Sequence, residues 1–352
     1  MAGNFVYSGG SGPVLSADLL ATYVFEKADS LSGESTSGAA VDWLLKVLGT
    51  CEADGIFKVA VWGLSIDEQT PISDSLTVMP FETLADSYMK RRILERARGC
   101  YDGSIWLAHN YFDKPGAAFT KRVPKFPYIG ADGASFKRIS ELQKDARDFW
   151  LLVQAASVGR TLAICSWFEY EDESLDFNNW QNSLAWILPE IQPRISMSTE
   201  VTGKTIRNHL KEFDVLPENL RARLVRSMER FELSQCRRAV VDRVLDLALA
   251  FEIAVSGPGP NTPVSWKVSV RCAQLIGGTV SERAEIRDAV QRLYSLRNKA
   301  THGSDIAKRD AVELNEAISS GVTIYQKMIV SFLAFGFDPE WGLMELQART
   351  PG

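Results

Sequence analysis

Hydrophobic and polar positions follow different patterns in the two halves of the chain. In the first half, short apolar runs alternate with a period of two, which is typical of strands with one buried face. In the segment from Ile56 to Asp67, the apolar residues first occupy odd positions and then, from Trp62 onward, even positions. A shift of one residue exchanges the two faces of a strand, so the pattern predicts a bulge near residues 61–63.

Other segments of the first half complete a mixed, strand-rich picture. Strands are expected at residues 76–79, 104–112 and 161–170, which are rich in aromatic and β-branched residues. Helices are expected at about 81–98 and 135–157, the second of which carries apolar residues at intervals of three and four. Loops are expected where Gly, Ser and Pro gather, at residues 8–12, 30–38 and 114–133.

After about residue 199 the pattern becomes almost wholly helical. Turn-forming Gly and Pro residues separate five predicted helices, at about 217–231, 234–255, 263–276, 282–301 and 305–335. Short turns between helices indicate a bundle. We therefore predict an α+β chain, with a β-rich mixed domain over residues 1–199 and an all-α helical bundle over residues 200–352.

Composition and charge restrict the classes of partner. The chain has 352 residues, 39 Lys and Arg against 44 Asp and Glu, and a net charge of −5, which argues against disorder and against a surface that binds nucleic acid everywhere. The segment from Lys204 to Arg243 is different, with ten Lys and Arg against six Asp and Glu. Any RNA contact is therefore expected in the helical half, although ordinary charged helix surfaces explain the excess equally well.

Several signatures of location and chemistry are missing from the sequence. No run of about 18 apolar residues and no secretory leader is seen, so a cytoplasmic location is expected. The five cysteines are widely spread without a C-x-x-C pair, and no phosphate-binding, dinucleotide-binding or zincin motif occurs. We expect no cofactor and no metal site.

One short segment carries groups suited to catalysis. The chain has three histidines, and of these His302 follows Arg297 and Asn298 at the end of a predicted helix. Residues five apart lie about 140° apart around a helix, whereas Asn298 and His302 share a face. A guanidinium that holds a phosphate and an imidazole that moves a proton are what metal-independent RNA cleavage requires. An Arg and a His at the end of a charged helix also occur on ordinary surfaces.

The surrounding chain, from about residue 215 to 335, resembles the HEPN superfamily and specifically its Apea-like branch. Tyr294, Arg297, His302 and Gly303 match the aromatic residue, the Arg and the His-Gly of the branch's motif. The segment 242–252 is similar to its first helix, and residues 271–276, followed by 282–283, are similar to its middle segment. Residues 63–67 and 76–81 are more faintly similar to the β-rich region that precedes such domains. Asn298 stands where the branch often has Ser. With Asn at this position, the motif resembles that of active HEPN ribonucleases more closely.

This resemblance implies a homodimeric, metal-independent endoribonuclease whose paired motifs line one cleft. In such enzymes the 2′-OH attacks the adjacent phosphorus and leaves a 2′,3′-cyclic phosphate. His302 is then expected to act as general acid or base, Arg297 to bind the phosphate, and Asn298 to orient His302 or bind the phosphate. Tyr294, Lys299 and Thr301 are secondary candidates for RNA contacts, although core packing is favoured for Tyr294. The resemblance also suggests prokaryotic phage defence or a toxin-like stress response, with the N-terminal domain sensing a trigger.

Two other functions fit the sequence. The helical part is also compatible with a non-catalytic HEPN module that dimerises and binds RNA or a protein. The β-rich half could instead bind a carbohydrate or another ligand, because seven of the nine tryptophans lie before residue 200. RNA cleavage in EDTA, and its loss on replacement of His302, separates the first function from the other two.

Overall fold

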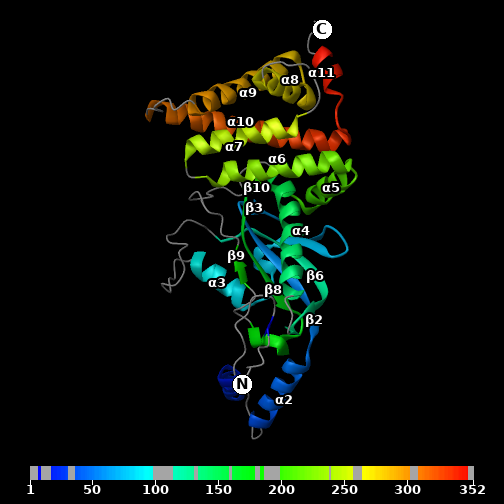
Figure 1. Ribbon diagram of the computed structural model, residues 1–352, viewed down its shortest axis with the longest axis vertical. Coiled ribbons are helices and arrows are strands. Elements are labelled where there is room, and N and C mark those ends of the chain that lie inside the picture. Colours follow the sequence, from blue (N-terminus) through cyan, green and yellow to red (C-terminus); the bar gives the residue numbers. More distant parts are fainter. Residues whose placement is uncertain are drawn as a thin grey trace. The chain divides into compact units, whose positions relative to one another are not determined.

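The chain folds into two compact units, each described here by itself. The computed structural model describes residues 7–8, 17–30, 36–97, 114–130, 134–157, 161–178, 183–185, 199–237, 239–256, 264–301 and 308–347 (Figure 1). The sheet unit comprises Met1–Arg147 and Ala163–Ile187, and the helical unit comprises Asp148–Leu162 and Leu188–Gly352. The α+β class is thus confirmed, whereas the division differs from a single boundary between residues 199 and 200. Residues 148–162 belong to the helical unit because Leu151, Leu152 and Ala155 are part of its core.

The sheet unit is organised around six strands. The pairs β4–β5, β5–β6, β6–β2 and β8–β9 are antiparallel. In spatial order the strands are β4 (Thr70–Pro71), β5 (Leu76–Pro80), β6 (Ala117–Pro127), β2 (Glu52–Trp62), β8 (Leu162–Tyr170) and β9 (Ser183–Ala185). The short strands β1 (Tyr7–Ser8) and β7 (Ile129–Gly130) form a separate antiparallel pair.

The bulge predicted near residues 61–63 is a strand end in the structure, because the β2–β6 register is continuous from Gly55 to Val61 and β2 ends at Trp62. Gly63 separates β2 from β3 (Leu64–Ser65) and has a φ of 74°, in the left-handed region that glycine adopts without strain. Trp62 and Leu64, the residues on either side, are both buried. The local change of chain direction therefore explains why the apolar positions change parity there.

The loop predicted over residues 114–133 is wrong, because most of it forms the central strand β6. The loop was predicted because the segment contains prolines, which have no backbone N–H to donate in a β-sheet. The β2–β6 register shifts between Ala53 and Gly55, so that Pro124 and Lys125 form a bulge outside the ladder. Lys125 has a φ of 48°, and its N–H donates to Asp54 Oδ1 at 2.9 Å. The bulge accommodates a proline that regular pairing would exclude.

Helices of the sheet unit agree only in part with the sequence pattern. The predicted helix over 81–98 divides into a 3₁₀ turn, η1 (Phe81–Thr83), and α3 (Tyr88–Ala97), whose start is capped by Ser87 Oγ accepting from Lys90 N at 3.3 Å. The helix α4 (Ala134–Ala156) is confirmed, while α1 (Ala17–Ser30), α2 (Thr36–Gly49) and the 3₁₀ segment η2 (Glu173–Asn178) were not predicted. The strand predicted at residues 104–112 lies outside the described residues.

The helical unit follows the predicted pattern closely. After the short strand β10 (Thr199–Glu200), α7 packs against α6, α9 and α10, and α8 packs against α9 (Figure 1). The described α-helices of the unit after α4 are α5 (Gly203–Asp214), α6 (Glu218–Cys236), α7 (Val240–Ala254), α8 (Val264–Ile276), α9 (Val280–Thr301), α10 (Lys308–Phe335) and α11 (Trp341–Gln347). Of these, α5 and α11 were not predicted individually.

Tyr325 of α10 lies at the centre of the helical core. Its ring stacks on Phe231 with centroids 4.4 Å apart and meets Phe251 edge-on at 5.4 Å. Its hydroxyl lies 2.6 Å from Ser227 Oγ, which donates to the carbonyl of Ala250 at 2.6 Å. The aromatic cluster and its satisfied polar atoms join α6, α7 and α10.

Within the described residues, the stretch Val312–Phe335 of α10 is the one helix apolar and long enough to span a membrane, with a mean hydropathy of 1.3. Half of this stretch is buried inside the protein. Ile318, Tyr325 and Phe332 belong to the helical core, and charged residues such as Glu316 and Lys327 interrupt the run. Burial in the core accounts for its apolar composition.

Candidate functional site

The candidate catalytic residues lie at the C-terminal end of α9. This helix begins with a reciprocal cap, in which Thr279 N and Oγ1 donate to Glu282 Oε2 at 2.7 and 2.8 Å and Glu282 N donates to Thr279 Oγ1 at 3.3 Å. Leu293 and Leu296 are buried in the core and fix the rotation of the helix about its axis. The last described turn then places Arg297 at the edge of the core, half-buried, and Asn298 and Lys299 in solvent.

Arg297 is electrostatically coupled to Glu252 near the end of α7. Both side chains are half-buried. Burial raises the pKa of the Glu252 carboxyl, and the charge of Arg297 acts in the opposite direction. Arg297 Nη1 also lies 3.4 Å from Asn298 Oδ1, at the long limit for a hydrogen bond. A carboxylate from a neighbouring helix thus interacts electrostatically with Arg297, a relation that the local spacing of residues 297–302 does not reveal.

Tyr294 is a packing residue and not an RNA contact. Its side chain is 2% exposed, and its hydroxyl donates to the carbonyl of Ala248 at 3.1 Å. Burial raises the pKa of this hydroxyl above its ordinary value. A ring held in this way cannot stack on a base. Core packing, the interpretation favoured for Tyr294, is therefore correct. The inclusion of Tyr294 among the candidates for RNA contacts was wrong.

The remaining candidates are only partly located. Thr301 is the last residue of α9, whereas His302 and Gly303 lie outside the described residues, as does His109. His209 on α5 was interpreted as solvated, but it is half-buried, and burial lowers the pKa of its imidazole. The structure thus brings Arg297, Asn298 and Lys299 together with Glu252, which the sequence pattern had not singled out as a partner.

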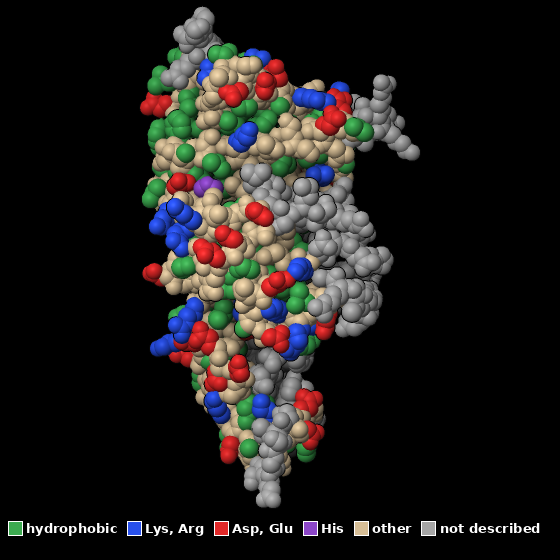
Figure 2. Space-filling view, turned by 180° about the vertical axis from the view of Figure 1, so that it is seen from behind, with side chains coloured by type: hydrophobic (Ala, Val, Ile, Leu, Met, Phe, Trp, Pro, Cys, Tyr) green, Lys and Arg blue, Asp and Glu red, His purple; other side chains and the backbone are tan. Residues whose placement is uncertain are grey.

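The basic excess over residues 204–243 is partly neutralised within the helical unit, by two aspartates. Arg223 forms a bidentate pair with Asp338 at 2.5 and 2.8 Å, while Arg230 and Arg237 both contact Asp246, at 3.3 and 3.0 Å. The two aspartates lie outside the segment counted in the sequence. Lys and Arg side chains are interspersed with Asp and Glu side chains on the face shown in Figure 2. Three of the ten basic residues of this segment thus form ion pairs with these two aspartates.

Other chemistry is limited in the described residues. No group of three or more His, Cys, Asp and Glu side chains placed to hold a metal ion occurs among them. Cys236 and Cys272 are buried, and burial raises the pKa of the Cys272 thiol. A pocket of about 630 Å³ lies between the α8–α9 turn and α10, away from Arg297, and is bordered by Glu282, Glu285 and Lys327.

Comparisons of the chain with protein-family models, with curated proteins and with solved structures found no match.

Glu252→Gln is expected to change the pH dependence of stability. A carboxyl whose folded-state pKa is raised binds its proton more tightly in the folded chain, so its contribution to stability falls as pH rises from its ordinary pKa through the raised one. The glutamine side chain of the variant does not titrate, so the variant does not lose stability in this way as pH rises. The stability of Glu252→Gln relative to wild type should therefore increase as pH rises from about 4 through the raised pKa of Glu252.

Urea denaturation across this pH range measures the difference. Glu285→Gln, the same replacement at an exposed position of α9, is the matched control, whose difference from wild type is expected to stay constant with pH. A Glu252→Gln difference that is equally flat would contradict the burial and coupling of Glu252.

Proposed function

We propose that the helical unit is a HEPN-type endoribonuclease that cleaves RNA without a metal ion. The observation that carries the proposal is the placement of Arg297 and Asn298 at the accessible end of α9, five and four residues before His302, on a helix otherwise anchored in the core. The half-burial of Arg297 supports it, because a side chain partly held by packing binds phosphate with less loss of side-chain entropy.

In the proposed reaction the 2′-oxygen of a ribose attacks the adjacent phosphorus while the bond from phosphorus to the 5′-oxygen breaks. The products are a 2′,3′-cyclic phosphate and a free 5′-hydroxyl. His302 moves a proton, as the base that removes it from the 2′-OH or the acid that delivers it to the 5′-oxygen. Arg297 holds the non-bridging oxygens as charge accumulates on them, and Asn298, four residues before His302, orients the imidazole or binds the phosphate.

The proposal includes a homodimer and a cytoplasmic role. A two-fold axis near the ends of two α9 helices places two Arg–His pairs in one cleft, so that one His302 acts as base and its symmetry mate as acid. The biological setting we propose is prokaryotic phage defence or a toxin-like stress response, in which the sheet unit responds to a trigger.

Arg297→Ala and His302→Ala are each expected to reduce RNA cleavage about 100-fold in EDTA, because each removes a group used in the transition state. Arg287→Ala is the matched control, since Arg287 is exposed on the same helix and pairs only with its neighbour Asp288 among the described residues. Arg297→Lys keeps the charge but loses the planar fork, so it should recover part of the activity. Fluorescent RNA fragments and the 2′,3′-cyclic phosphate end are the readouts.

Two results would overturn the nuclease. One is cleavage that survives in His302→Ala at the wild-type rate, and the other is cleavage that stops in EDTA and returns with a divalent metal ion. Far-ultraviolet circular dichroism of each variant must match wild type, so that a loss of activity is not a loss of fold.

A non-catalytic HEPN module is the second candidate, and one observation favours it. The half-buried carboxyl of Glu252 interacts electrostatically with Arg297, which also suits a structural role for this arginine. The module would be supported over the nuclease by a purified dimer that cleaves none of a broad set of RNA substrates and whose affinity for RNA is the same in wild type and in Arg297→Ala.

A further inference from the structure

The sheet unit contains a pocket that the proposed nuclease does not use. It has a volume of about 540 Å³ and lies between β2, the chain leading into α3, the end of β8 and the start of η2. This is large enough for a ligand the size of an amino acid derivative or a small polyamine. Apolar parts of its wall come from Ile56, Tyr88, Met89, Phe168 and Leu175.

Charged residues of the pocket wall are mainly acidic. Five carboxylates line it against two cationic side chains. The acidic residues are Asp86, Glu169, Glu171, Asp172 and Glu173, and the basic residues are Lys58 and Arg91. The wall therefore carries an excess of negative charge beside apolar surface.

One of the two cations is already neutralised inside the protein. Lys58 is 4% exposed and forms an ion pair with Glu169. The other carboxylate oxygen of Glu169 accepts from Trp167 Nε1 at 2.5 Å. Burial of a lysine requires such a partner, so this pair is a neutral part of the wall and does not offer a free positive charge to an anion.

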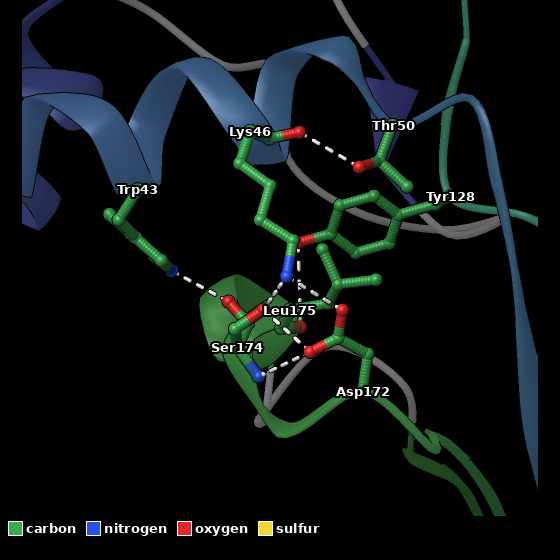
Figure 3. A network of polar contacts seen from close by, with 7 residues as sticks. All are labelled: Trp43, Lys46, Thr50, Tyr128, Asp172, Ser174 and Leu175. Carbon is green, nitrogen blue, oxygen red and sulfur yellow. Dashed lines mark hydrogen bonds and ion pairs between the residues drawn. The ribbon is translucent and has the colours of Figure 1, made fainter.

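The acidic rim at η2 is held in place by a polar network (Figure 3). Lys46 Nζ donates to Asp172 Oδ2 at 2.8 Å, and Ser174 N donates to Asp172 Oδ1 at 2.9 Å. Trp43 Nε1 donates to the carbonyl of Ser174 at 2.6 Å, which ties η2 to α2. The hydrogen bonds from Lys46 and Ser174 lower the pKa of Asp172 to about 2, so the rim is ionised at neutral pH.

Glu173 is the acidic wall residue left open to a ligand. Arg91 pairs with Asp86 at 2.6 Å, and Arg122 pairs with Glu171 at 2.8 Å. In contrast, Glu173 is exposed and has no hydrogen-bond or ion-pair partner among the described residues. An ammonium or guanidinium group entering the pocket would form an ion pair with Glu173, the one carboxylate of the described wall that the protein does not pair.

We propose that this pocket binds a small organic cation, in which an ammonium or guanidinium group lies against Glu173 and an aliphatic body lies against the apolar wall. Because Asp86, Glu169, Glu171 and Asp172 are each paired with a Lys or Arg, the charge of Glu173 selects a cation. Side chains such as Met89 and Tyr88 cover methylene groups, as they do for the stems of Lys and Arg. The proposal concerns binding alone and does not depend on ribonuclease activity in the helical unit.

Isothermal titration of the full chain tests the proposal with two probes that carry the same chemistry. Spermidine represents a free polyamine, and Nα-acetyl-arginine amide represents a basic side chain of a peptide. Nα-acetyl-norleucine amide, which lacks the cation, is expected to bind about two- to five-fold more weakly than the arginine probe, the usual effect of one exposed charge pair. Nα-acetyl-glutamate amide, whose charge is repelled by Glu173, is expected to bind at least about ten-fold more weakly. Binding of one cationic probe and not the other identifies the source of the ligand.

Two variants and a control separate this site from unspecific attraction. Glu173→Gln is expected to weaken binding of the cation about two- to five-fold, the usual effect of one exposed charge pair. Ala85→Trp, at an exposed position of the pocket wall, should fill the pocket and weaken binding at least about ten-fold. Glu141→Gln, the same charge change at an exposed position of α4 outside the pocket, should leave the affinity unchanged.

Three results would overturn the proposal. They are the absence of heat with both cationic probes at millimolar concentration, equal affinities in Ala85→Trp and wild type, and competition by calcium chloride that sodium chloride of the same ionic strength does not match. The third would assign the carboxylates to a metal ion in place of an organic cation.

Discussion

Replacement of Arg271 by alanine is expected to lower the free energy of unfolding of the helical unit by about 3–5 kcal/mol. Arg271 lies on α8 and is 1% exposed. Its Nε donates to Glu345 Oε1 at 2.7 Å, and its Nη1 donates to the carbonyl of Val255 at 2.8 Å. Its guanidinium also lies 5.1 Å from the ring centroid of Trp341. One side chain thus joins α8, the end of α7 and α11.

The expected loss of stability is large because Arg271→Ala leaves two buried polar groups without their partner. Glu345 is 6% exposed and would keep a charge without its partner, and the carbonyl of Val255 would lose a hydrogen bond. Breaking a buried pair is costly for this reason, whereas replacing both partners by apolar residues is often close to neutral. The double variant Arg271→Leu with Glu345→Leu is therefore expected to be more stable than Arg271→Ala.

Urea denaturation of the full chain gives the free energies, and hydrogen exchange locates the change, which should appear first in α11. Arg283→Ala is the matched control, because Arg283 donates to the carbonyl of Gly278 at 3.0 Å in an exposed setting. Its expected cost is below about 1 kcal/mol. An Arg271→Ala variant that loses no more stability than Arg283→Ala would show that the pair does not fasten α11.

The Arg271–Glu345 pair also marks a limit of sequence analysis. Periodicity predicted the helix α8 from Trp266, Val270, Ala273 and Ile276, which recur at intervals of three and four. In the structure, the residues of α8 that belong to the helical core are Val268, Cys272 and Leu275. Periodicity could not predict that Arg271 joins this buried face, because the partner carboxylate lies 74 residues away. A local pattern records which face is apolar and not which distant charge makes a buried cation tolerable.

The sheet unit shows the same limit for backbone structure. The alternation of apolar residues was sufficient to predict β2, and its change of parity at Trp62 located an irregularity, although this is a strand end and not the predicted bulge. Pro124 made β6 resemble a loop, because the bulge that removes it from the ladder depends on pairing with β2. The helices α1 and α2 are flanked by Gly- and Ser-rich segments that weaken a helical pattern.

At the candidate site, local spacing placed Arg297 and Asn298 correctly near the end of a helix. It did not identify Glu252, whose relation to Arg297 arises from the packing of α7 against α9. It also counted the basic residues of α6 without the aspartates that pair with them, Asp246 and Asp338, since these follow later in the chain. Charge over a sequence window thus overstated the basic surface.

Gly55→Ala is expected to lower the stability of the sheet unit by about 3 kcal/mol. Gly55 is buried in β2, and a Cβ at this position would lie 2.6 Å from the backbone oxygen of Glu169 and against the ring of Phe168. Phe168 is 3% exposed and stacks on Phe126 with centroids 4.2 Å apart. The ring has no room to move away, and the backbone oxygen can move only if β8 shifts.

Gly38→Ala is the matched control for this substitution. Gly38 lies in α2, and a Cβ there would have no heavy atom within 4 Å. Alanine reduces the entropy lost by the backbone in a helix, so this variant is expected to gain about 0.5–1 kcal/mol. The same chemical change should therefore have opposite signs at the two positions when measured by urea denaturation.

A third variant separates the two contacts of Gly55. Phe168→Leu shortens the ring side chain and relieves one contact of the added methyl group, but it leaves the backbone oxygen of Glu169 in place. Combining Phe168→Leu with Gly55→Ala should therefore recover only part of the loss, once the cost of Phe168→Leu alone is subtracted. Full recovery would mean that the aromatic ring alone excludes a side chain at residue 55, and that β2 and β8 can separate to admit the methyl group.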